Sequence, residues 1–381
     1  MCKRILLITT TVAIAGLIAA GATASRSQHQ GRSFLVGIYD DPMTLGTPDK
    51  GFATLKSLRA QVVRITLSWR TVAGRKRPKL ATDPADPAYN WETYDRAVLL
   101  AKKNKIQVLF SITGTPVWAN GRRAARIAPT NFRDLQNFAT AAARRYSGTF
   151  KRKDDDTVLP AVRLWLAWSE PNNPIFLAPQ YKRVHGRWLA WSAYAYARIC
   201  NAIYSGIHGT GLSGERVACG GTDPFGNNQP RSRRPSISPL AFLRLSKRYG
   251  LRRFDAWAHH PYSSTPLQSP FTKPKSKTAV ILGNIGDLIK ELTRLYGSKP
   301  LWITEYGYQT RPPDRFFGVS WKNQAKYLAE AYAIARKNPR IGMMIWFLIR
   351  DERRLSGWQS GFFTAAGKRK PSYFAFRQLR H

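Results

Sequence analysis

Arg163-Leu-Trp-Leu-Ala-Trp-Ser-Glu-Pro-Asn-Asn173 is the segment from which the architecture of this chain can be inferred. Its first half is an almost continuous run of Leu, Ala and Trp without helical spacing, which predicts a buried strand. The run ends at Ser169-Glu-Pro171, because proline cannot continue a strand ladder and keeps the preceding residue out of the right-handed helical region. We therefore expect the Glu170 carboxylate at the carboxyl end of a buried strand, where an unpaired charge is costly.

Strand and helix patterns alternate on both sides of this stretch. Strands are expected at 33–39, 61–69, 106–112, 162–168, 217–222, 254–259, 301–304 and 341–348, and helices at 54–59, 90–104, 131–146, 188–207, 239–248, 279–296, 321–337 and 372–379. Such alternation favours parallel strands joined by right-handed crossovers. Eight units predict an α/β fold, a single (β/α)8 or TIM barrel. The alternative, an open doubly wound sheet, normally has a glycine-rich turn after its first strand, where this chain has Tyr39-Asp-Asp-Pro42.

The first 24 residues have the pattern of a secretory signal peptide. A basic start at Lys3 and Arg4 precedes an apolar run over 5–20, and Ala22-Thr-Ala24 is typical of a cleavage site. An uncleaved N-terminal anchor is the alternative, although the apolar run is short for a membrane span. We therefore expect a secreted or cell-envelope-associated protein, with a signal peptide at 1–24, a polar junction at 25–32 and one catalytic domain at 33–381.

Two cysteines, Cys200 and Cys219, remain beyond the expected leader. They fall on an expected helix and on the strand that follows it. They could form a disulfide in an oxidising compartment, or both could be buried thiols. The six histidines and the cysteines show no spacing typical of zinc ligands. The sequence therefore predicts no metal and no cofactor.

The chain is strongly basic, with 61 Lys and Arg against 22 Asp and Glu and a formal net charge of +39. The basic residues lie in short clusters at 151–153, 231–234, 273–277 and 368–370, without a nucleic-acid-binding motif. A solvated surface is the simplest interpretation. Electrostatic association with an anionic cell envelope or an acidic glycan is the alternative. Specific nucleic-acid binding is not expected, and the sequence makes no prediction of the oligomeric state.

The active site of such a barrel lies at the carboxyl ends of the strands, and this rule selects among the acidic residues. Four aspartates are set aside because they enter a strand from the opposite end or stand in a proline-containing turn: Asp40, Asp41, Asp223 and Asp255. Glu170 and Glu305 remain, at the ends of the fourth and seventh strands, from which they can converge. Two converging carboxylates suit glycoside hydrolysis, in which one protonates the leaving oxygen and the other attacks the anomeric carbon or activates water.

The motifs around these glutamates resemble those of the clan A glycoside hydrolases. Trp168-Ser-Glu-Pro-Asn172 resembles the Trp-Asn-Glu-Pro-Asn signature of the clan, and Trp302-Ile-Thr-Glu-Tyr-Gly307 resembles its strand-seven signature. Thr115-Pro-Val-Trp-Ala119 is most similar to families 39 and 5. The resemblance implies that Glu170 is the acid/base and Glu305 the nucleophile. It also implies a retaining glycosidase that cleaves O-glycosidic bonds of a poly- or oligosaccharide by double displacement.

The resemblance also implies roles for supporting residues. Arg64 matches the arginine that supports the nucleophile, Tyr262 matches the tyrosine that hydrogen-bonds it, and Trp346 matches the tryptophan that floors the sugar subsite. The other residues expected to bind substrate or support the site are Trp118, Trp168, Ser169, Asn172 and His260. The structural alternatives are a polar pair beneath a loop for His260 and Tyr262, and ordinary core packing for the tryptophans.

Ser169 is the one departure from this pattern. The clan normally has asparagine here, which contacts the 2-hydroxyl of the sugar. Serine is shorter, although it can still donate and accept hydrogen bonds. The alternative function is therefore a barrel that binds carbohydrate without cleaving it or with weak activity.

Overall fold

The closed parallel barrel predicted from the sequence is present in the computed structural model, which describes residues 34–379. Its strands are β1 (Leu35–Tyr39), β2 (Val62–Ser68), β3 (Gln107–Thr113), β4 (Leu164–Ala167), β7 (Arg216–Thr222), β8 (Ala256–His259), β9 (Leu301–Tyr306) and β10 (Ile341–Phe347). They follow the order β1-β10-β9-β8-β7-β4-β3-β2, and β1 pairs in parallel with both β2 and β10, which closes the barrel. The expected leader and junction lie outside the described residues.

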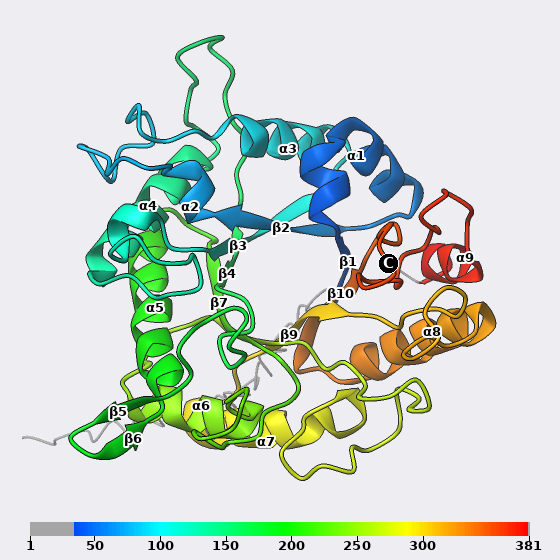
Figure 1. The fold of residues 1–381 in the computed structure, drawn as a ribbon. Helices are drawn as coiled ribbons and strands as arrows, with labels where there is room; N and C mark the ends of the chain where they lie inside the picture. The colour runs from blue at the N-terminus through cyan, green and yellow to red at the C-terminus, as the bar shows by residue number, and fades with distance from the viewer. Residues whose placement is uncertain (1–33, 380–381) are drawn as a thin grey trace, which may run out of the picture. The chain divides into compact units, whose positions relative to one another are not determined.

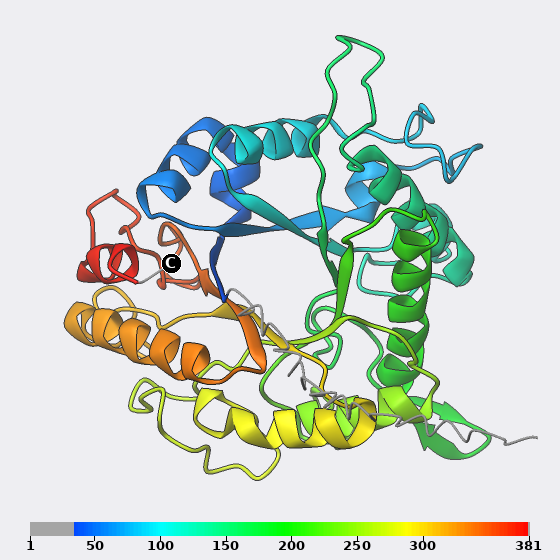
Figure 2. The same ribbon diagram turned by 180° about the vertical axis from the view of Figure 1, so that it is seen from behind.

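Helices surround the strands as a ring (Figure 1, Figure 2). They are α1 (Pro48–Ser57), α2 (Trp69–Val72), α3 (Glu92–Lys103), α4 (Phe132–Arg145), α5 (Trp191–His208), α6 (Pro239–Arg248), α7 (Ile285–Tyr296), α8 (Trp321–Lys337) and α9 (Pro371–Arg377), with short helices η1 (Pro42–Gly46), η2 (Val117–Ala119) and η3 (Leu282–Asn284). Helix α4 shows why these segments are helical and why they pack on the barrel. The Asn131 side chain caps its first turn by accepting from the Arg133 N–H, and Leu135 and Phe138 on its inner face are fully buried. Within residues 34–379, no helix is both long and apolar enough to cross a membrane.

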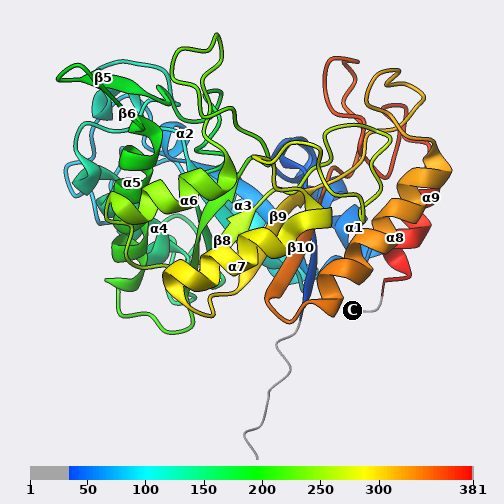
Figure 3. The same ribbon diagram turned by 90° about the horizontal axis from the view of Figure 1, so that it is seen from below.

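The core has two parts, because side chains of a strand alternate between the inside and the outside of the barrel. The smaller cluster includes Leu109, Leu166 and Trp302, which fill the barrel interior, and the larger one packs the helices onto the strands. The interior is therefore a packed core rather than a channel. Long loops rise on one side of the barrel, the side that also bears the small hairpin β5–β6 (Figure 3).

The helix predicted at 188–207 is wrong at its start. Trp188 belongs to a two-stranded antiparallel hairpin formed by β5 (Lys182–Val184) and β6 (Arg187–Leu189), and α5 begins only at Trp191. His185 and Gly186 connect the strands with φ angles of 46° and 77°. Two consecutive left-handed residues are the geometry of a tight hairpin turn, which a helix-period pattern cannot reveal.

Other boundaries differ by a few residues. The helix expected at 54–59 starts earlier, at Pro48, because proline is favourable in the first helical turn. The sixth barrel strand starts at Ala256 rather than at residue 254.

One of the open alternatives is settled by a contact. Cys200 on α5 and Cys219 on β7 form a disulfide. The basic cluster at 368–370 is not wholly solvated, because Lys370 is fully buried and its Nζ donates to Asp351 Oδ1 at 2.7 Å. Desolvation of such a charge is costly unless it is paired, and this pair fixes the start of α9 against the loop after β10.

Candidate active site

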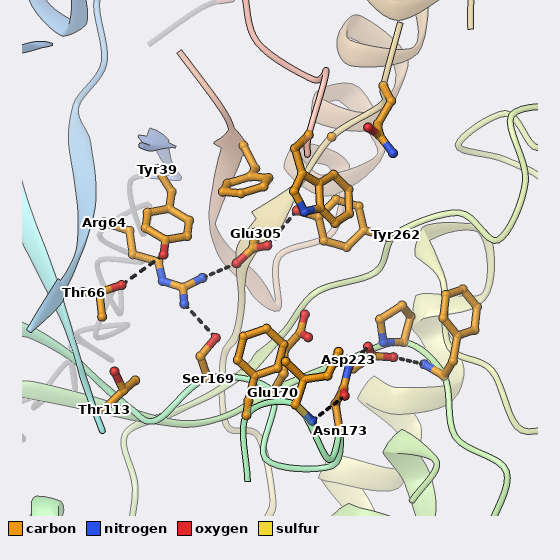
Figure 4. Close-up of a pocket in the computed structure, with 18 of the residues that line it drawn as sticks. Tyr39, Arg64, Thr66, Thr113, Ser169, Glu170, Asn173, Asp223, Tyr262 and Glu305 are labelled. Atoms are coloured by element: carbon orange, nitrogen blue, oxygen red, sulfur yellow. Dashed lines mark hydrogen bonds and ion pairs between the residues drawn. The ribbon is translucent and has the colours of Figure 1, made fainter. Parts of the chain in front are cut away.

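A cavity of about 1020 Å³ opens at the carboxyl ends of the barrel strands. Both predicted glutamates line it, Glu170 directly after β4 and Glu305 within β9. Figure 4 shows Glu305 beside Arg64 and Tyr262, and Glu170 beside Asn173 and Asp223. The barrel thus brings together two carboxylates that are 135 residues apart in the sequence.

The backbone around Glu170 is held in an uncommon conformation. Trp168 and Glu170 have φ angles of 67° and 43°, in the left-handed region that residues other than glycine rarely adopt. Hydrogen bonds hold the turn: the Trp168 N–H donates to the Ile112 carbonyl at 2.9 Å and the Glu170 N–H to the Gly221 carbonyl at 2.8 Å. Strain of this kind persists only where surrounding contacts enforce it, and here it sets the direction of the Glu170 side chain.

Glu305 is held by two donors, as the family resemblance implies. Arg64 Nη1 lies 2.8 Å from Glu305 Oε2, and the Tyr262 hydroxyl donates to Oε1 at 2.9 Å. Arg64 is only 1% exposed, and its other nitrogen, Nη2, donates to Ser169 Oγ at 2.9 Å. A guanidinium and a phenol on opposite oxygens orient the carboxylate and stabilise its negative charge.

Glu170 has a different electrostatic environment. Burial raises its pKa to about 8, and the negative charge of Glu305 adds to this effect, while Arg64 opposes it. The carboxyl group is therefore protonated at neutral pH. A carboxyl group with a raised pKa next to a carboxylate that is ion-paired with a guanidinium is the arrangement expected of a general acid beside a nucleophile.

His260 connects the two sides of the site. Its Nδ1 lies 2.9 Å from Glu170 Oε1, and its Nε2 lies 3.0 Å from Thr304 Oγ1 and 3.3 Å from Arg64 Nη1. Complete burial lowers the pKa of His260 to about 3, so the imidazole is neutral. Arg64 can only donate, which favours the tautomer in which Nε2 accepts and Nδ1–H donates to Glu170.

The same three groups have the composition of a metal site. One oxygen of each glutamate and one nitrogen of His260 lie within 4.8 Å of one another. Arg64 argues against a metal there, because its guanidinium already binds Glu305 and places a fixed positive charge next to a cation. The arrangement is better suited to acid/base and nucleophilic chemistry.

Trp168 and Ser169 also line the cavity. The Trp168 ring is buried, and its Nε1 donates to the Phe176 carbonyl at 2.9 Å. Ser169 is tied to Arg64 through its hydroxyl. Serine therefore contributes to the support of Glu305, a contact that its expected role toward the sugar did not include.

Trp346 does not line the cavity, contrary to its expected role as the floor of a subsite. It is fully buried on the outer face of β10, where its ring stacks on Phe362 and its Nε1 donates to the Ser360 carbonyl at 2.9 Å. The next residue, Phe347, points the other way, lines the cavity and contacts the Trp358 ring. The alternation of a strand explains the difference of one position.

Asn172 and Trp118 also lie away from the cavity lining. Asn172 lies on the loop after β4 and is fully buried. Its Nδ2 donates to three backbone carbonyls of the segment after β7, and these hydrogen bonds join the two loops: Asp223, Phe225 and Ile237. Trp118 lies on η2 and packs edge-on against Trp69, with 5.7 Å between the ring centroids. Both residues therefore stabilise the loops rather than face a ligand.

Several residues that line the cavity were not expected there from the sequence: Tyr39, Asp41, Thr66, Asn173, Asp223 and Phe347. Asp223 was set aside as a turn cap. It does cap a turn, since Oδ1 accepts from the Phe225 N–H at 2.7 Å, but Oδ2 accepts from Asn173 Nδ2 at 2.9 Å beside Glu170. Burial, together with the charge of Glu170, raises the pKa of Asp223 to about 7. Asp223 directly follows a barrel strand, and this position could have indicated a place at the cavity. The neighbouring Pro224 instead favoured its interpretation as a turn residue. Asp255, by contrast, is structural as expected, and accepts from His208 and the Val217 N–H.

No protein-family model matches the chain, and no curated protein sequence is similar to it. Solved structures are similar in fold. A family 39 glycoside hydrolase from Bacteroides cellulosilyticus has a TM-score of 0.64 at 18% identity, over 91% of this chain and 63% of its own. A monomeric beta-xylosidase from Caulobacter crescentus has a TM-score of 0.56 at 18% identity, over 91% and 68%. A GH5_18 protein from Streptomyces cattleya in complex with Manb1-4GlcNAc has a TM-score of 0.58 at 14% identity, over 91% and 80%. These likenesses establish the (β/α)8 fold, and this chain spans less than two thirds of the length of the first of them.

Proposed function

We propose that this protein is a retaining glycoside hydrolase with Glu170 as acid/base and Glu305 as nucleophile. The observation that carries the proposal is the unequal environment of the two glutamates. Arg64 and Tyr262 bind Glu305 as an anion, whereas burial keeps Glu170 protonated. The fold similarity to glycoside hydrolases of families 39 and 5 supports the same chemistry by analogy.

The geometry gives each group a step. Glu305 attacks the anomeric carbon while Glu170 passes its proton to the leaving oxygen, which yields a glycosyl ester on Glu305. Glu170, now ionised, takes a proton from water as that water attacks the anomeric carbon and releases Glu305. The Nδ1–H of His260 can stabilise the Glu170 anion formed between these steps.

The closeness of the carboxylates supports retention. Retaining enzymes have their carboxyl groups about 5–5.5 Å apart, whereas inverting enzymes need about 6.5–9.5 Å to admit a water molecule. One oxygen pair of Glu170 and Glu305 lies within 4.8 Å. This approach of the two carboxyl groups is nearer to the separation of retaining enzymes than to that of inverting enzymes, and it favours direct attack.

The test is the Glu305→Gln variant on a panel of aryl glycosides. We expect kcat/KM to fall on the order of 10⁶-fold, as for other removed nucleophiles, with the circular dichroism spectrum unchanged. The matched control is Glu92→Gln on the exposed first turn of α3, which should retain full activity. The anomer released first by the wild type, followed by NMR, tests retention. Full activity of Glu305→Gln, or an inverted product, contradicts the proposal. A wild type that binds glycosides but hydrolyses none indicates a non-catalytic carbohydrate-binding barrel instead.

We also infer that the protein is exported. The pattern over 1–24 supports this inference, and so does the Cys200–Cys219 disulfide, because disulfides persist in oxidising compartments. The mature N-terminus, sequenced from expressed and exported protein, should begin after Ala24. Protein that stays in the cytoplasm with free thiols would contradict export.

A further inference from the structure

The part of the cavity wall next to Glu170 is apolar. Ile175 and Phe176 follow Glu170 on the loop after β4, and Pro224 and Phe225 stand on the loop after β7. All four line the cavity. We call these four residues the acid-side wall.

Hydrogen bonds hold the acid-side wall in place. They involve the polar side chains of Asn173 and Asp223, which lie next to it. Asn173 Oδ1 accepts from the Ile175 N–H at 3.1 Å, and its Nδ2 donates to Asp223 Oδ2 at 2.9 Å. The second oxygen of Asp223 accepts from the Phe225 N–H at 2.7 Å. The two loops are thus joined, and the Asn173 and Asp223 side chains are already engaged with protein partners (Figure 4). A ligand that lies against this wall meets a preformed apolar surface.

The wall exposes apolar surface at the cavity. Ile175 is 53% and Phe176 41% exposed. Contiguous exposed apolar residues at a cavity commonly mark a ligand-binding surface. Arg126, on the neighbouring loop, also lines the cavity, and its planar guanidinium is suited to stacking on an aromatic ring.

The position of the wall relative to Glu170 determines which part of a substrate it meets. The acid/base stands on the side of the leaving group, because it must reach the glycosidic oxygen. This step rests on the proposed function. We propose that the acid-side wall is a subsite for an apolar aglycone, such as an aryl or cycloalkyl group, rather than for a second sugar ring. A sugar ring placed here would turn hydroxyl groups toward four side chains that cannot hydrogen-bond them, which costs affinity relative to an apolar ring. The inference replaces the poly- or oligosaccharide expected from the resemblance with a different substrate class, glycosides of apolar alcohols or phenols.

The test compares two aglycones, each with a six-membered ring, by the affinity with which the protein binds glycosides that carry them. No hydrolysis is measured. The probes are hydrolysis-resistant S-linked glycosides of xylose, glucose, mannose and glucuronic acid, each prepared with a cyclohexyl group and with a second pyranose as aglycone. Titration calorimetry on the wild type gives both dissociation constants for each sugar. We expect the cyclohexyl thioglycoside of the preferred sugar to bind at least about 10-fold more tightly than the matching thio-disaccharide, which corresponds to desolvation of one apolar ring face.

Substitution locates the effect. Phe176→Ala should remove most of this 10-fold preference. Phe374→Ala on α9, which removes a phenyl group that is also half exposed (51%), should leave it unchanged. Tighter binding of the thio-disaccharides, no preference between the two aglycones, or an equal effect of Phe176→Ala on both probes overturns the inference. If the preference is present but the corresponding O-glycosides are not hydrolysed, the apolar subsite stands and the proposed hydrolase function fails.

Discussion

The two sides of the cavity differ in the polarity of the side chains that form them. Around Glu305 the wall includes buried and half-buried polar groups that hydrogen-bond to one another or to Glu305: Arg64, Ser169, Tyr262, Thr66 and Tyr39. Around Glu170 the wall is apolar and partly exposed, and its polar groups serve the backbone of their own loops. The nucleophile side therefore has fixed charges, and the acid side has a low-polarity environment.

This difference accounts for two identical side chains having opposite properties. A carboxylate with a guanidinium at 2.8 Å is stabilised as an anion, whereas one in an apolar wall retains its proton. The assignment of roles thus depends on the walls rather than on the glutamates themselves. Each prediction below changes one wall and leaves the other intact.

Among the changes that test this comparison, the largest effect is expected for Glu170→Ala, which removes the acid and leaves Glu305 in place. For glycosides with poor leaving groups, kcat/KM should fall about 10²–10⁴-fold, because these substrates most need a proton. For activated aryl glycosides the first step should be much less affected. The measurement is kcat/KM across a series of phenols of decreasing pKa. Equal losses along the whole series would contradict the acid role.

Arg64→Met is the corresponding change on the nucleophile side. We expect kcat/KM to fall about 10²–10³-fold with little dependence on the leaving group, because a fixed charge next to the nucleophile is lost. The free energy of unfolding should also fall by about 3 kcal/mol, since Glu305 keeps a nearly buried charge without its partner.

Arg145→Met is the matched control for this change. Arg145 pairs with the buried Asp95 in the helical layer, away from the cavity. Urea unfolding should show a comparable loss of stability in this variant, with kcat/KM unchanged. If Arg145→Met reduces activity as strongly as Arg64→Met, the effect of Arg64 is on folding alone.

The smallest effect concerns pH. The protonated form of Glu170 is the active one, so kcat/KM should decline as the pH rises through about 8. The charge of the neighbouring carboxylate Asp223 is coupled to that of Glu170. Asp223→Asn should therefore shift this decline to lower pH, while kcat/KM at pH 6 changes only slightly. Asp41→Asn, on the nucleophile side, is the control and should leave the position of the decline where it was.

The sequence predicted the barrel correctly and placed both glutamates at the ends of barrel strands, because these features depend on short-range patterns. An apolar run that ends in a carboxylate and a proline can be recognised in the sequence without tertiary information. The same is true of the alternation of strand and helix patterns. Arg64, Tyr262 and Glu305 also come together as the resemblance implied.

The errors arose where one residue of register decides the outcome. Trp346 and Phe347 are both large and aromatic, and only the closed sheet shows which of them faces the cavity. Asn172 and Asn173 are indistinguishable by composition, yet one joins two loops from beneath and the other stands in the wall. Asp223 combines a turn cap with a place beside Glu170, and the first role concealed the second.

The hairpin β5–β6 has a consequence for solubility. A closed barrel has no free strand edge, so among the named strands of the described residues only β5 and β6 offer unpaired backbone groups to another chain. Open edges invite strand-to-strand association, and charged side chains, lysine above all, are a common protection against it. Lys182, Arg183 and Arg187 lie on these two strands. Part of the excess positive charge thus guards against aggregation at this exposed sheet edge.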